Sequence, residues 1–379
     1  MKGVLIDGNT SSQFSSRFYM YLDYLASTPI SDTALNAMTE AYRELYGNAS
    51  SNHEQGRVSS EAVYEAQQTI ANVIGAEPSE IIFTSGATES NNLAIIGLAE
   101  KHKNRGKHLI TSSIEHSCVL NVFKHLERRG FQVSYLNPDE NGIITVDTIK
   151  DAITPATTLV SIMHVNNELG TINPIREIGQ LCFGNEIIFH TDAAQSIGKL
   201  EIDVLDDNLD ALSASAHKFF GPKGIGFLYL RNARLLEIEP LIHGSGQQNG
   251  LRGGTVPAPL IVGMLTAISE FEYEEQKYSK LKKQFLKKLN SFGVSYTING
   301  QNTLSNVINL TFEKQEDYAT YTTQSSICVS QGSACNSNSV APSHVLTALG
   351  LTAEHAFKSV RISFYDETLL ESANVFTTK

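Results

Sequence analysis

Short apolar runs alternate with segments of helical pattern over the first part of the chain. Seven runs of strand length are rich in Ile, Val, Leu and Phe: residues 80–86, 108–114, 131–136, 158–165, 186–192, 210–217 and 225–230. Such runs are typical of strands buried on both faces of a parallel sheet. Helical patterns such as residues 88–104 lie between several of them. The alternation predicts an α/β fold on a mostly parallel sheet, with ligands at the carboxyl ends of its strands.

The pattern changes after residue 257. Residues 259–293 read as one long helix, amphipathic towards its end, or as two helices joined together. Further on, residues 306–312 and 360–364 have the composition of strands. We therefore expect a large domain over residues 27–257 and a smaller α+β domain formed by residues 1–26 and 258–379.

Composition and charge narrow the class of protein. The content of 41% hydrophobic and 18% charged residues is typical of a soluble enzyme. No segment reaches the roughly 18 apolar residues of a membrane helix, and the first residues lack a signal-peptide core. The four cysteines form no C-x-x-C pair, so we expect a reducing cytoplasm. The net charge of −11 disfavours direct binding of nucleic acid, although a local basic patch is compatible with that average.

The first chemical motif follows the run that ends at Thr84. Ser85, Gly86 and Ala87 predict a tight turn, and we expect a helix to begin at Thr88 or Glu89. The unpaired N–H groups and the positive dipole end of such a helix suit a phosphate group. The alternative is an ordinary helix start, with Ser85 or Thr88 as the N-cap residue.

Two further strand ends carry ionisable side chains. Asp192 ends one run and Gln195 follows it, so the carboxylate either holds a cationic ring nitrogen or caps a helix. Ser215, His217 and Lys218 end another run, beside aromatic residues. A lysine in that place is a candidate for a lowered pKa and for imine formation, whereas His217 can equally be structural.

His116 projects from the end of the run 108–114. A zinc site formed with Cys118 lacks further ligands at suitable spacing, and Cys118 is better explained as a packing residue. The carboxyl ends of parallel strands meet at one edge of a sheet, so Thr88, His116, Asn167, Asp192 and Lys218 are expected to converge there. A phosphate cradle, an imidazole, a carboxylate and an imine-forming lysine together predict a pyridoxal phosphate site without a metal.

The motifs resemble, in order and spacing, the cysteine desulfurases of the NifS/IscS group, which belong to the class-V aminotransferases of pyridoxal phosphate fold type I. The matching segments lie between about residues 21 and 363 and include "YLDYLASTP", "FTSGATESNN", "SSIEHSCVLN", "SIMHVNNELGTINPI", "FHTDAAQSIGK", "SASAHKFFGPKGIGFLY", "LRGGTVPAPLIVG" and "GSACNSNSVAPSHVLTALGL". The resemblance implies a seven-stranded, mostly parallel sheet in the large domain and a homodimer.

The resemblance also implies roles for individual residues. Lys218 is expected to form the imine with pyridoxal 5'-phosphate, His116 to stack on its ring, Asp192 to meet the ring nitrogen and Gln195 the phenolic oxygen. The phosphate group is expected to contact Ala87, Thr88, Ser215, His217 and, across the dimer, Thr255 of the partner subunit. Asn167, beside the cofactor, and Arg361 are expected to bind the carboxylate of the substrate.

Cys335 lies within "VSQGSACNSNSV", where the density of Ser, Gly and Asn predicts a loop that can move. The resemblance implies that its thiolate takes the sulfur of L-cysteine as a persulfide, leaves L-alanine, and passes the sulfur to a protein acceptor. His116 is a suitable acid or base for this step. Only 18 residues follow Arg361, which leaves iron-sulfur cluster assembly, tRNA thiolation and DNA phosphorothioation open as destinations.

The chain departs from the family pattern at two other places. Gln248 and Asn249 replace an acidic-basic pair, and residues 364–366 (Phe-Tyr-Asp) replace Leu-Gly-Arg. The alternatives to a desulfurase are another fold type I enzyme, such as a selenocysteine lyase or an aminotransferase, and an interaction subunit with reduced catalysis. Aminotransferases do not need Cys335, and a subunit without catalysis does not need Lys218.

Overall fold

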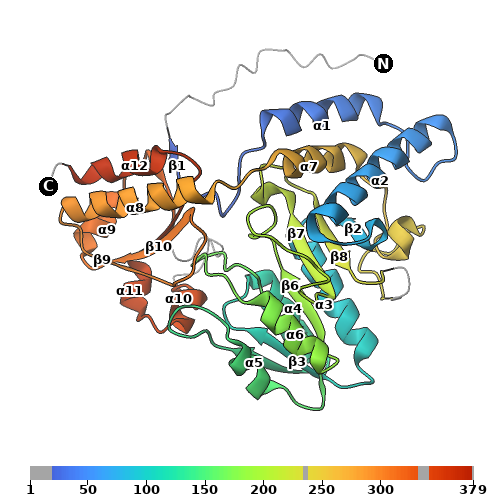
Figure 1. Ribbon diagram of the computed structural model, residues 1–379, viewed down its shortest axis with the longest axis horizontal. Coiled ribbons are helices and arrows are strands. Elements are labelled where there is room, and N and C mark those ends of the chain that lie inside the picture. Colours follow the sequence, from blue (N-terminus) through green and yellow to red (C-terminus); the bar gives the residue numbers. More distant parts are fainter. Residues whose placement is uncertain (1–18, 234–237, 332–340, 378–379) are drawn as a thin grey trace, which may run out of the picture.

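The computed structural model describes residues 19–233, 238–331 and 341–377. Its largest layer is a seven-stranded sheet in which every strand except β8 runs in the same direction (Figure 1). The order across the sheet is β2 (Ile81–Thr84), β8 (Gly226–Leu230), β7 (Ala211–Ser215), β6 (Ile188–Asp192), β5 (Thr157–Ser161), β3 (His108–Ser112) and β4 (Gln132–Leu136). Each predicted apolar run overlaps one of these strands, so the predicted sheet is confirmed.

Helices cover both faces of this sheet. One face packs against α1 (Asp32–Glu44), α2 (Glu54–Ile74), α5 (Val146–Ala152), α6 (Ile175–Gly184) and α7 (Ala258–Glu270), and the other against α3 (Ala87–His102) and α4 (Ser117–Arg128). Neighbours along a strand alternate between the two cores: Phe83 enters the first and Ile82 the second. Because both faces are buried, the strands read as continuous apolar runs rather than as alternating ones.

The edge strand β2 is covered by the side chain of Gln248, one of the residues at which the chain departs from the family pattern. Phe83 donates its N–H to Gln248 Oε1 (2.6 Å) and accepts from Gln248 Nε2 (2.8 Å), so a carboxamide takes the place of a neighbouring strand. Gln248 and Asn249 both have positive φ, within the short helix η3 (Gln247–Gly250). The departure at these positions therefore protects a sheet edge that would otherwise expose unpaired backbone groups.

Two helices rather than one follow residue 257. The first, α7, packs on α1 and α2, whereas α8 (Glu275–Ser291) packs on the smaller sheet. The division of the chain at residue 257 stays a prediction. Because α7 shares the core of the large sheet, we propose that the second boundary lies at residues 271–274, between the two helices.

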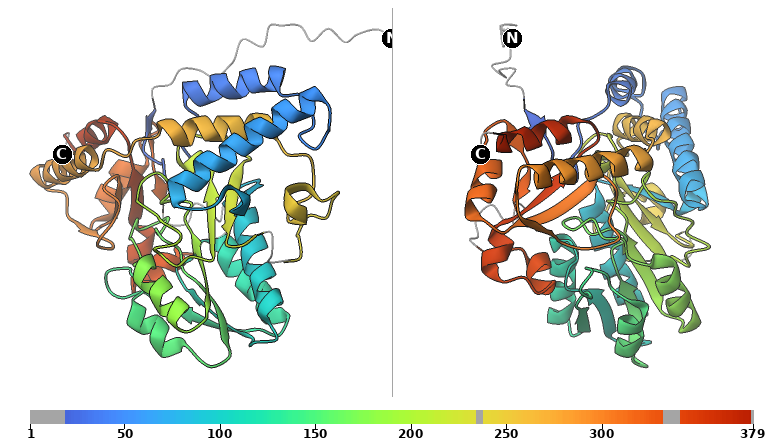
Figure 2. Two further views of the ribbon diagram at one scale, coloured as in Figure 1. Left: turned by 45° about the vertical axis from the view of Figure 1, so that its right-hand side comes forward. Right: turned by 60° about the vertical axis from the view of Figure 1, so that its left-hand side comes forward.

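The smaller sheet is antiparallel and lies beside the large one (Figures 1 and 2). Its order is β12 (Ser330–Gln331), β13 (Ser359–Ser363), β10 (Val307–Phe312) and β9 (Tyr296–Ile298). The other elements of this region are β1 (Met20–Tyr21), which pairs with β11 (Ile327–Cys328), α9 (Gln315–Thr322), α10 (His344–Ala348), α11 (Ala353–Phe357), α12 (Thr368–Ser372) and the short helix η4 (Ala373–Phe376). Its core combines α8, α12 and η4 with the inner face of the sheet.

An aromatic cluster around Tyr365 joins the large-sheet region to the smaller region. Tyr365 belongs to the segment 364–366, the second place where the chain departs from the family pattern. The ring of Tyr365 packs edge-on against Tyr24 (5.2 Å between centroids), Phe220 (4.9 Å) and Phe271 (6.1 Å). The preceding Phe364 is fully buried in the core of the smaller region. The departure from Leu-Gly-Arg therefore builds an apolar junction, and Phe220 lies only two residues after Lys218.

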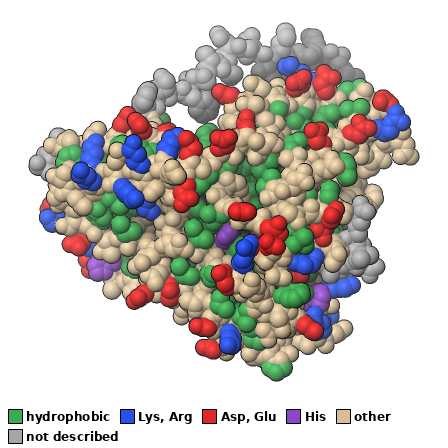
Figure 3. Space-filling view, in the orientation of Figure 1, with side chains coloured by type: hydrophobic (Ala, Val, Ile, Leu, Met, Phe, Trp, Pro, Cys, Tyr) green, Lys and Arg blue, Asp and Glu red, His purple; other side chains and the backbone are tan. Residues whose placement is uncertain are grey.

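The surface carries mixed charge. Figure 3 shows acidic and basic side chains interspersed over one face, with Lys and Arg side chains grouped at the upper left, where α8 lies. Lys277, Lys280, Lys283 and Lys287 are exposed along that helix. A local basic surface thus exists in spite of the net charge of −11. None of the helices within residues 19–233, 238–331 and 341–377 is both long and apolar enough to cross a membrane.

Candidate active site

A cavity of about 620 Å³ lies at the carboxyl edge of the large sheet and reaches the smaller one. It brings together most of the predicted site residues: Ala87, Thr88, His116, Asn167, Asp192, Gln195, Ser215, His217, Lys218 and Arg361. Thr255 does not line it and is exposed, so its role across a dimer stays a prediction. Cys335 lies outside the described residues.

One wall of the cavity is the start of α3. The helix begins at Ala87, so the predicted start at Thr88 or Glu89 is wrong by one or two residues, and its N-cap is Gly86 without a side-chain cap. Gly86 has φ 146°, and a Cβ atom there would lie 3.2 Å from Ser215 Oγ. The close approach leaves backbone N–H groups, the helix dipole and a hydroxyl at one place, which suits an anion such as a phosphate group.

Glu89 anchors this helix start to a distant segment. Its Oε2 accepts from the Ser85 N–H (2.7 Å), and its Oε1 accepts from Arg252 Nε (2.9 Å). Burial acts to raise the pKa of Glu89, but the hydrogen bonds from Arg252 and Ser85 outweigh it and hold the pKa below its ordinary value. The ion pair fixes the segment that carries Thr255 beside the anion cradle.

Asp192 ends β6 with its carboxylate held in one orientation. Asn91 Nδ2 donates to Oδ2 (2.7 Å), and the Ala194 N–H donates to Oδ1 (2.9 Å). Turns rather than a helix follow Asp192, so the alternative of a helix cap is wrong. A buried carboxylate oriented by two neutral donors suits a protonated ring nitrogen.

His116 is the N-cap residue of α4, and its hydrogen bonds define its tautomer. Nδ1 accepts from the Cys118 N–H (3.2 Å), so the proton of the neutral ring is on Nε2. Burial lowers the pKa of His116 against the opposing effect of Asp192, and Lys218 and His344 lower it further. Cys118 Sγ lies 3.0 Å from the same Nδ1 atom, and burial raises its pKa to about 12. Cys118 therefore stays a thiol and orients His116, beyond the packing role expected for it.

Lys218 follows β7 in the short helix η2 (Ala216–Lys218), and its amine reaches the N-terminal segment. Nζ donates to the carbonyl oxygens of Leu25 (2.6 Å) and Ala26 (2.8 Å). The Leu25 oxygen also accepts from Gln195 Nε2 (2.8 Å). His217 Nδ1 lies 3.2 Å from Ser27 Oγ, and burial, with help from neighbouring lysines, lowers its pKa to about 4. His217 is thus neutral at physiological pH.

Two further buried ionisable residues, Lys199 and Glu115, lie next to these side chains and were not predicted from the sequence. Lys199 Nζ donates to Gln195 Oε1 (3.4 Å), and burial, with the charge of Lys218, lowers its pKa to about 7. Glu115, next to His116, accepts from Ser112 Oγ (2.7 Å) and the Met163 N–H (2.9 Å), and burial raises its pKa to about 8. Neither residue lines the cavity.

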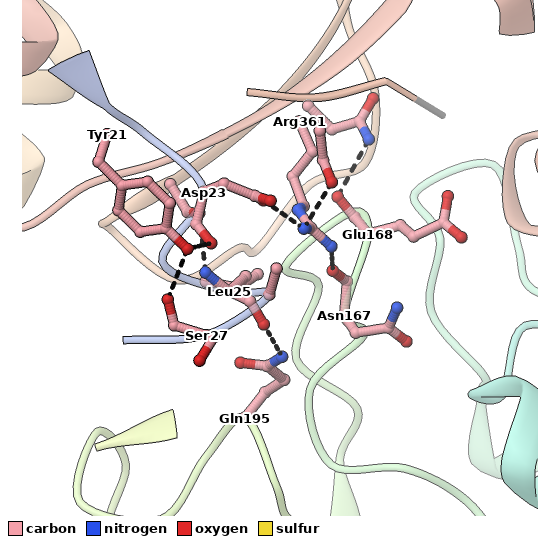
Figure 4. A network of polar contacts seen from close by, with 12 residues as sticks. Tyr21, Asp23, Leu25, Ser27, Asn167, Glu168, Gln195 and Arg361 are labelled. Carbon is pink, nitrogen blue, oxygen red and sulfur yellow. Dashed lines mark hydrogen bonds and ion pairs between the residues drawn. The ribbon is translucent and has the colours of Figure 1, made fainter. Parts of the chain in front are cut away.

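Arg361 reaches the opposite wall of the cavity from β13 (Figure 4). Nη1 donates to the Asn167 carbonyl oxygen (2.6 Å), and Nη2 donates to Asp23 Oδ1 (2.6 Å) and Ser330 Oγ (2.9 Å). Arg361 Nε and Asn167 Oδ1 are buried and have no hydrogen-bond partner among the described residues. One donor and one acceptor are thus left for a ligand.

The donor set fits pyridoxal phosphate. The start of α3 and Ser215 form an anion cradle, Asp192 offers an oriented carboxylate, and Lys218 offers an amine in the same cavity. The volume of about 620 Å³ is of the size that small-molecule sites have. The unpartnered atoms of Asn167 and Arg361 leave room for a second polar ligand beside the cofactor.

The chain is similar to curated proteins over most of its length. Residues 20–374 match the model of the family "Aminotransferase class-V". The cysteine desulfurase of Homo sapiens is 43% identical over 349 residues, which are 90% of this chain and 76% of the human protein. The cysteine desulfurase IscS of Rickettsia bellii is 44% identical over 349 residues, covering 90% of this chain and 85% of that protein.

Solved structures give the same result. The structure of SspA in complex with cysteine is 49% identical, has a TM-score of 0.85, and the match covers 91% of this chain and 98% of SspA. DndA from Streptomyces lividans is 36% identical, with a TM-score of 0.76 and coverage of 89% of this chain and 97% of DndA. The agreement spans both sheets rather than one motif.

Proposed function

The chain belongs to the class-V aminotransferases and, within them, to the pyridoxal phosphate-dependent cysteine desulfurases, and we propose that it converts L-cysteine to L-alanine with Cys335 as the sulfur acceptor. The family resemblance read from the sequence is confirmed. The observation that carries the proposal is a single cavity lined by Lys218, Asp192, His116 and Arg361.

Pyridoxal phosphate, when bound, supplies an electron sink for negative charge at the Cα atom of an amino acid. Lys218 would hold it covalently, Asp192 would meet its ring nitrogen, Gln195 its phenolic oxygen and His116 the face of its ring. Ala87, Thr88, Ser215 and His217 would hold its phosphate group, because they surround the start of α3 in the same cavity.

The residues of this chain divide the remaining work. Arg361 binds the substrate carboxylate through its Nε–H group, which has no other partner, and Asn167 through the N–H groups of its side-chain amide. Lys218 Nζ takes the proton from the substrate Cα atom, and the carbonyl groups of Leu25 and Ala26 hold this amine at the cavity wall. His116, with its proton on Nε2, donates or accepts a proton beside the sulfur atom.

Transfer of sulfur needs a nucleophile. The Cys335 thiolate attacks the sulfur atom of the substrate, so that an S–S bond forms and the Cβ–S bond breaks, and protonation at carbon completes alanine. The product on the protein is a persulfide of Cys335. Cys118 cannot replace it, because burial keeps that side chain a thiol.

The test compares Cys335→Ser with Cys328→Ser, a cysteine in β11 that does not line the cavity. We expect the wild-type protein and Cys328→Ser to form alanine and a protein persulfide from L-cysteine. Cys335→Ser should form neither, while it keeps the absorption of the bound cofactor. Normal alanine formation by Cys335→Ser would contradict the proposal.

We further propose a homodimer in which Thr255 of the partner subunit completes the phosphate site. Thr255 is exposed and the Arg252–Glu89 ion pair holds its segment at the start of α3. Tyr42, Tyr46 and Tyr64 are more than half exposed on α1, α2 and the connection between them, which favours a covered surface there. Light scattering should give twice the mass of the chain. Mixed dimers of wild-type subunits with Lys218→Ala/Thr255→Ala double-mutant subunits should be less active than mixed dimers of wild-type and Lys218→Ala subunits, because the one site that keeps Lys218 takes residue 255 from the other subunit.

The persulfide is proposed to pass to a protein acceptor in a reducing cytoplasm, for iron-sulfur cluster assembly, tRNA thiolation or DNA phosphorothioation. Cys118, Cys182 and Cys328 are not disulfide-bonded, which agrees with such a compartment. Co-purification of candidate acceptors with protein that carries labelled sulfur on Cys335 tests each destination. Label that stays on the desulfurase in the presence of all acceptors would contradict the transfer step.

A further inference from the structure

Asp23 forms an ion pair with Arg361, the arginine that binds the substrate carboxylate in the proposed function. Its Oδ1 atom lies 2.6 Å from Arg361 Nη2, and both side chains line the cavity. The exposed fractions are 21% for the Asp23 side chain and 9% for that of Arg361. The pair is therefore mostly buried, and Asp23 contributes the same chemical group to Arg361 as an amino-acid substrate does.

The hydrogen bonds of Arg361 leave little room for a second carboxylate. A guanidinium group binds a carboxylate bidentately through one of two forks, and both forks include Nη2. The two N–H groups of Nη2 are taken by Asp23 and by Ser330, and Nη1 also donates to Asn167. A bidentate substrate must therefore displace Asp23 or Ser330, or bind monodentately beside the charge of Asp23.

The backbone holds Asp23 in this place. Its carbonyl oxygen accepts from the Tyr21 hydroxyl (3.2 Å), and it forms an isolated β-bridge with Ser363, two residues from Arg361 in β13. The Leu25 N–H donates to Ser363 Oγ (2.9 Å). The carboxylate is thus presented by the segment that carries Asp23, Leu25 and Ser27 (Figure 4). The same segment binds Lys218 through the carbonyl groups of Leu25 and Ala26.

We propose that Asp23 is a specificity-determining residue that competes with the substrate carboxylate for Arg361. The inference rests on the proposed function, in which Arg361 binds that carboxylate. While the site holds no amino acid, Asp23 neutralises and aligns the guanidinium group. When an amino acid binds, the negative charge of Asp23 weakens its binding, whether Asp23 is displaced or stays as a like charge. An amine without a carboxylate does not enter this competition.

The test measures equilibrium binding to the holoenzyme by calorimetry, with L-alanine and ethylamine, which differ only in the carboxylate. Asp23→Asn keeps the shape and a hydrogen bond but removes the charge. We expect it to bind L-alanine about five-fold more tightly, with unchanged affinity for ethylamine. Asp23→Ser, which also lacks the charge, provides a second variant and should show the same direction.

Two control variants test whether Asp23 acts by its charge or by holding Arg361 in place. Ser330→Ala removes a neutral partner of the same Nη2 atom but no charge, so L-alanine binding should change much less than it does in Asp23→Asn. Asp207→Asn breaks an ion pair with Arg176 (2.9 Å) that does not line the cavity, and it should leave both affinities unchanged. Steady-state kinetics should show a lower KM for L-cysteine in Asp23→Asn.

Unchanged or weaker binding of L-alanine by Asp23→Asn would overturn the inference, as would an equal change for both amines, which indicates a structural effect. Those results are distinct from failure of the proposed function. A wild-type holoenzyme that prefers L-alanine to ethylamine no more than Arg361→Ala does would refute the role of Arg361, and the competition with it. A wild-type preference that does not respond to Asp23 contradicts the inference alone.

Discussion

The two walls of the cavity are built in different ways. The cofactor wall consists of residues at or just after the ends of parallel strands, such as His116, Asp192 and Lys218, and each is held by neighbours in the large-sheet region or by the segment 25–27. The carboxylate wall joins Asp23, Asn167, Ser330 and Arg361, which come from four distant parts of the chain. The first wall belongs to one sheet, and the second exists only where two sheets meet.

This difference indicates that substitutions can alter substrate recognition and cofactor binding separately. A change in the cofactor wall acts on a rigid edge of one sheet. A change in the carboxylate wall acts on a contact between regions that the aromatic cluster around Tyr365 also joins. We therefore expect loss of chemistry from the first wall and loss of substrate affinity from the second.

The largest effect is expected for Lys218→Ala. Without its amine, the cofactor has no covalent attachment and the Cα proton has no base, so alanine formation should fall by at least about a thousand-fold. Activity and the absorption of retained cofactor after desalting measure the change. Lys223→Ala removes an exposed lysine that lines the same cavity five residues further on, and should keep most of its activity. Equal losses of activity in the two variants would show that the position of Lys218 after β7 does not set it apart from other lysines of the cavity.

Arg361→Ala should separate the two walls. Loss of a charged bidentate donor is expected to raise KM for L-cysteine about a hundred-fold, with the cofactor spectrum unchanged. Arg176→Ala, which loses ion pairs with Asp206 and Asp207 away from the cavity, should keep the wild-type KM. If Arg361→Ala loses the cofactor instead, the walls are not independent.

Asn91→Ala tests how firmly the cofactor wall is held. The substitution leaves Asp192 Oδ2 without its donor inside the protein, and should cost about 2 kcal/mol of the free energy of unfolding. Urea denaturation measures it. Asn92→Ala, next to it but only partly buried and bonded to the Thr88 carbonyl, is expected to cost much less. Equal costs would mean that Asp192 does not depend on Asn91.

The last prediction concerns the change of stability per pH unit that the buried groups Glu115 and Lys199, behind the cofactor wall, cause. Glu115 has a folded-state pKa of about 8, above its ordinary value of 4.5, so the folded protein binds more protons and stability falls as pH rises from 4.5 to 8. Lys199 has a folded-state pKa of about 7, below 10.5, so the unfolded chain binds more protons and stability rises from pH 7 to 10.5.

Glu115→Gln should therefore remove a falling slope, and Lys199→Met a rising one, each of at most about 1.4 kcal/mol per pH unit. Urea denaturation between about pH 5 and pH 10 measures both slopes. A wild-type profile whose slopes neither variant changes would show that these groups are solvated in the native protein.

The sequence by itself determined the large sheet and its active edge. Each strand of that sheet lies in a run rich in apolar residues, because burial on both faces favours apolar side chains, and polar side chains inside the strands, such as His190 and Ser213, contact one another. Strand ends fall where the run stops, so His116, Asp192 and Lys218 could be placed at one edge before any contact was known. The start of α3 was misplaced by one or two residues, because Gly86 adopts a positive φ of 146°, which favours glycine, and the helix begins directly after it.

Only the tertiary structure decided the carboxylate wall and the junction. Asp23 lies in an isolated β-bridge and Ser330 in a two-residue strand, and neither pairing leaves a periodic pattern in the sequence. Asp23 and Arg361 are more than 300 residues apart in the chain. Lys199 and Glu115 became visible only through their burial. Local patterns record which face of an element is buried, but which distant side chains share a cavity depends on how the sheets pack, and no short stretch of sequence contains that information.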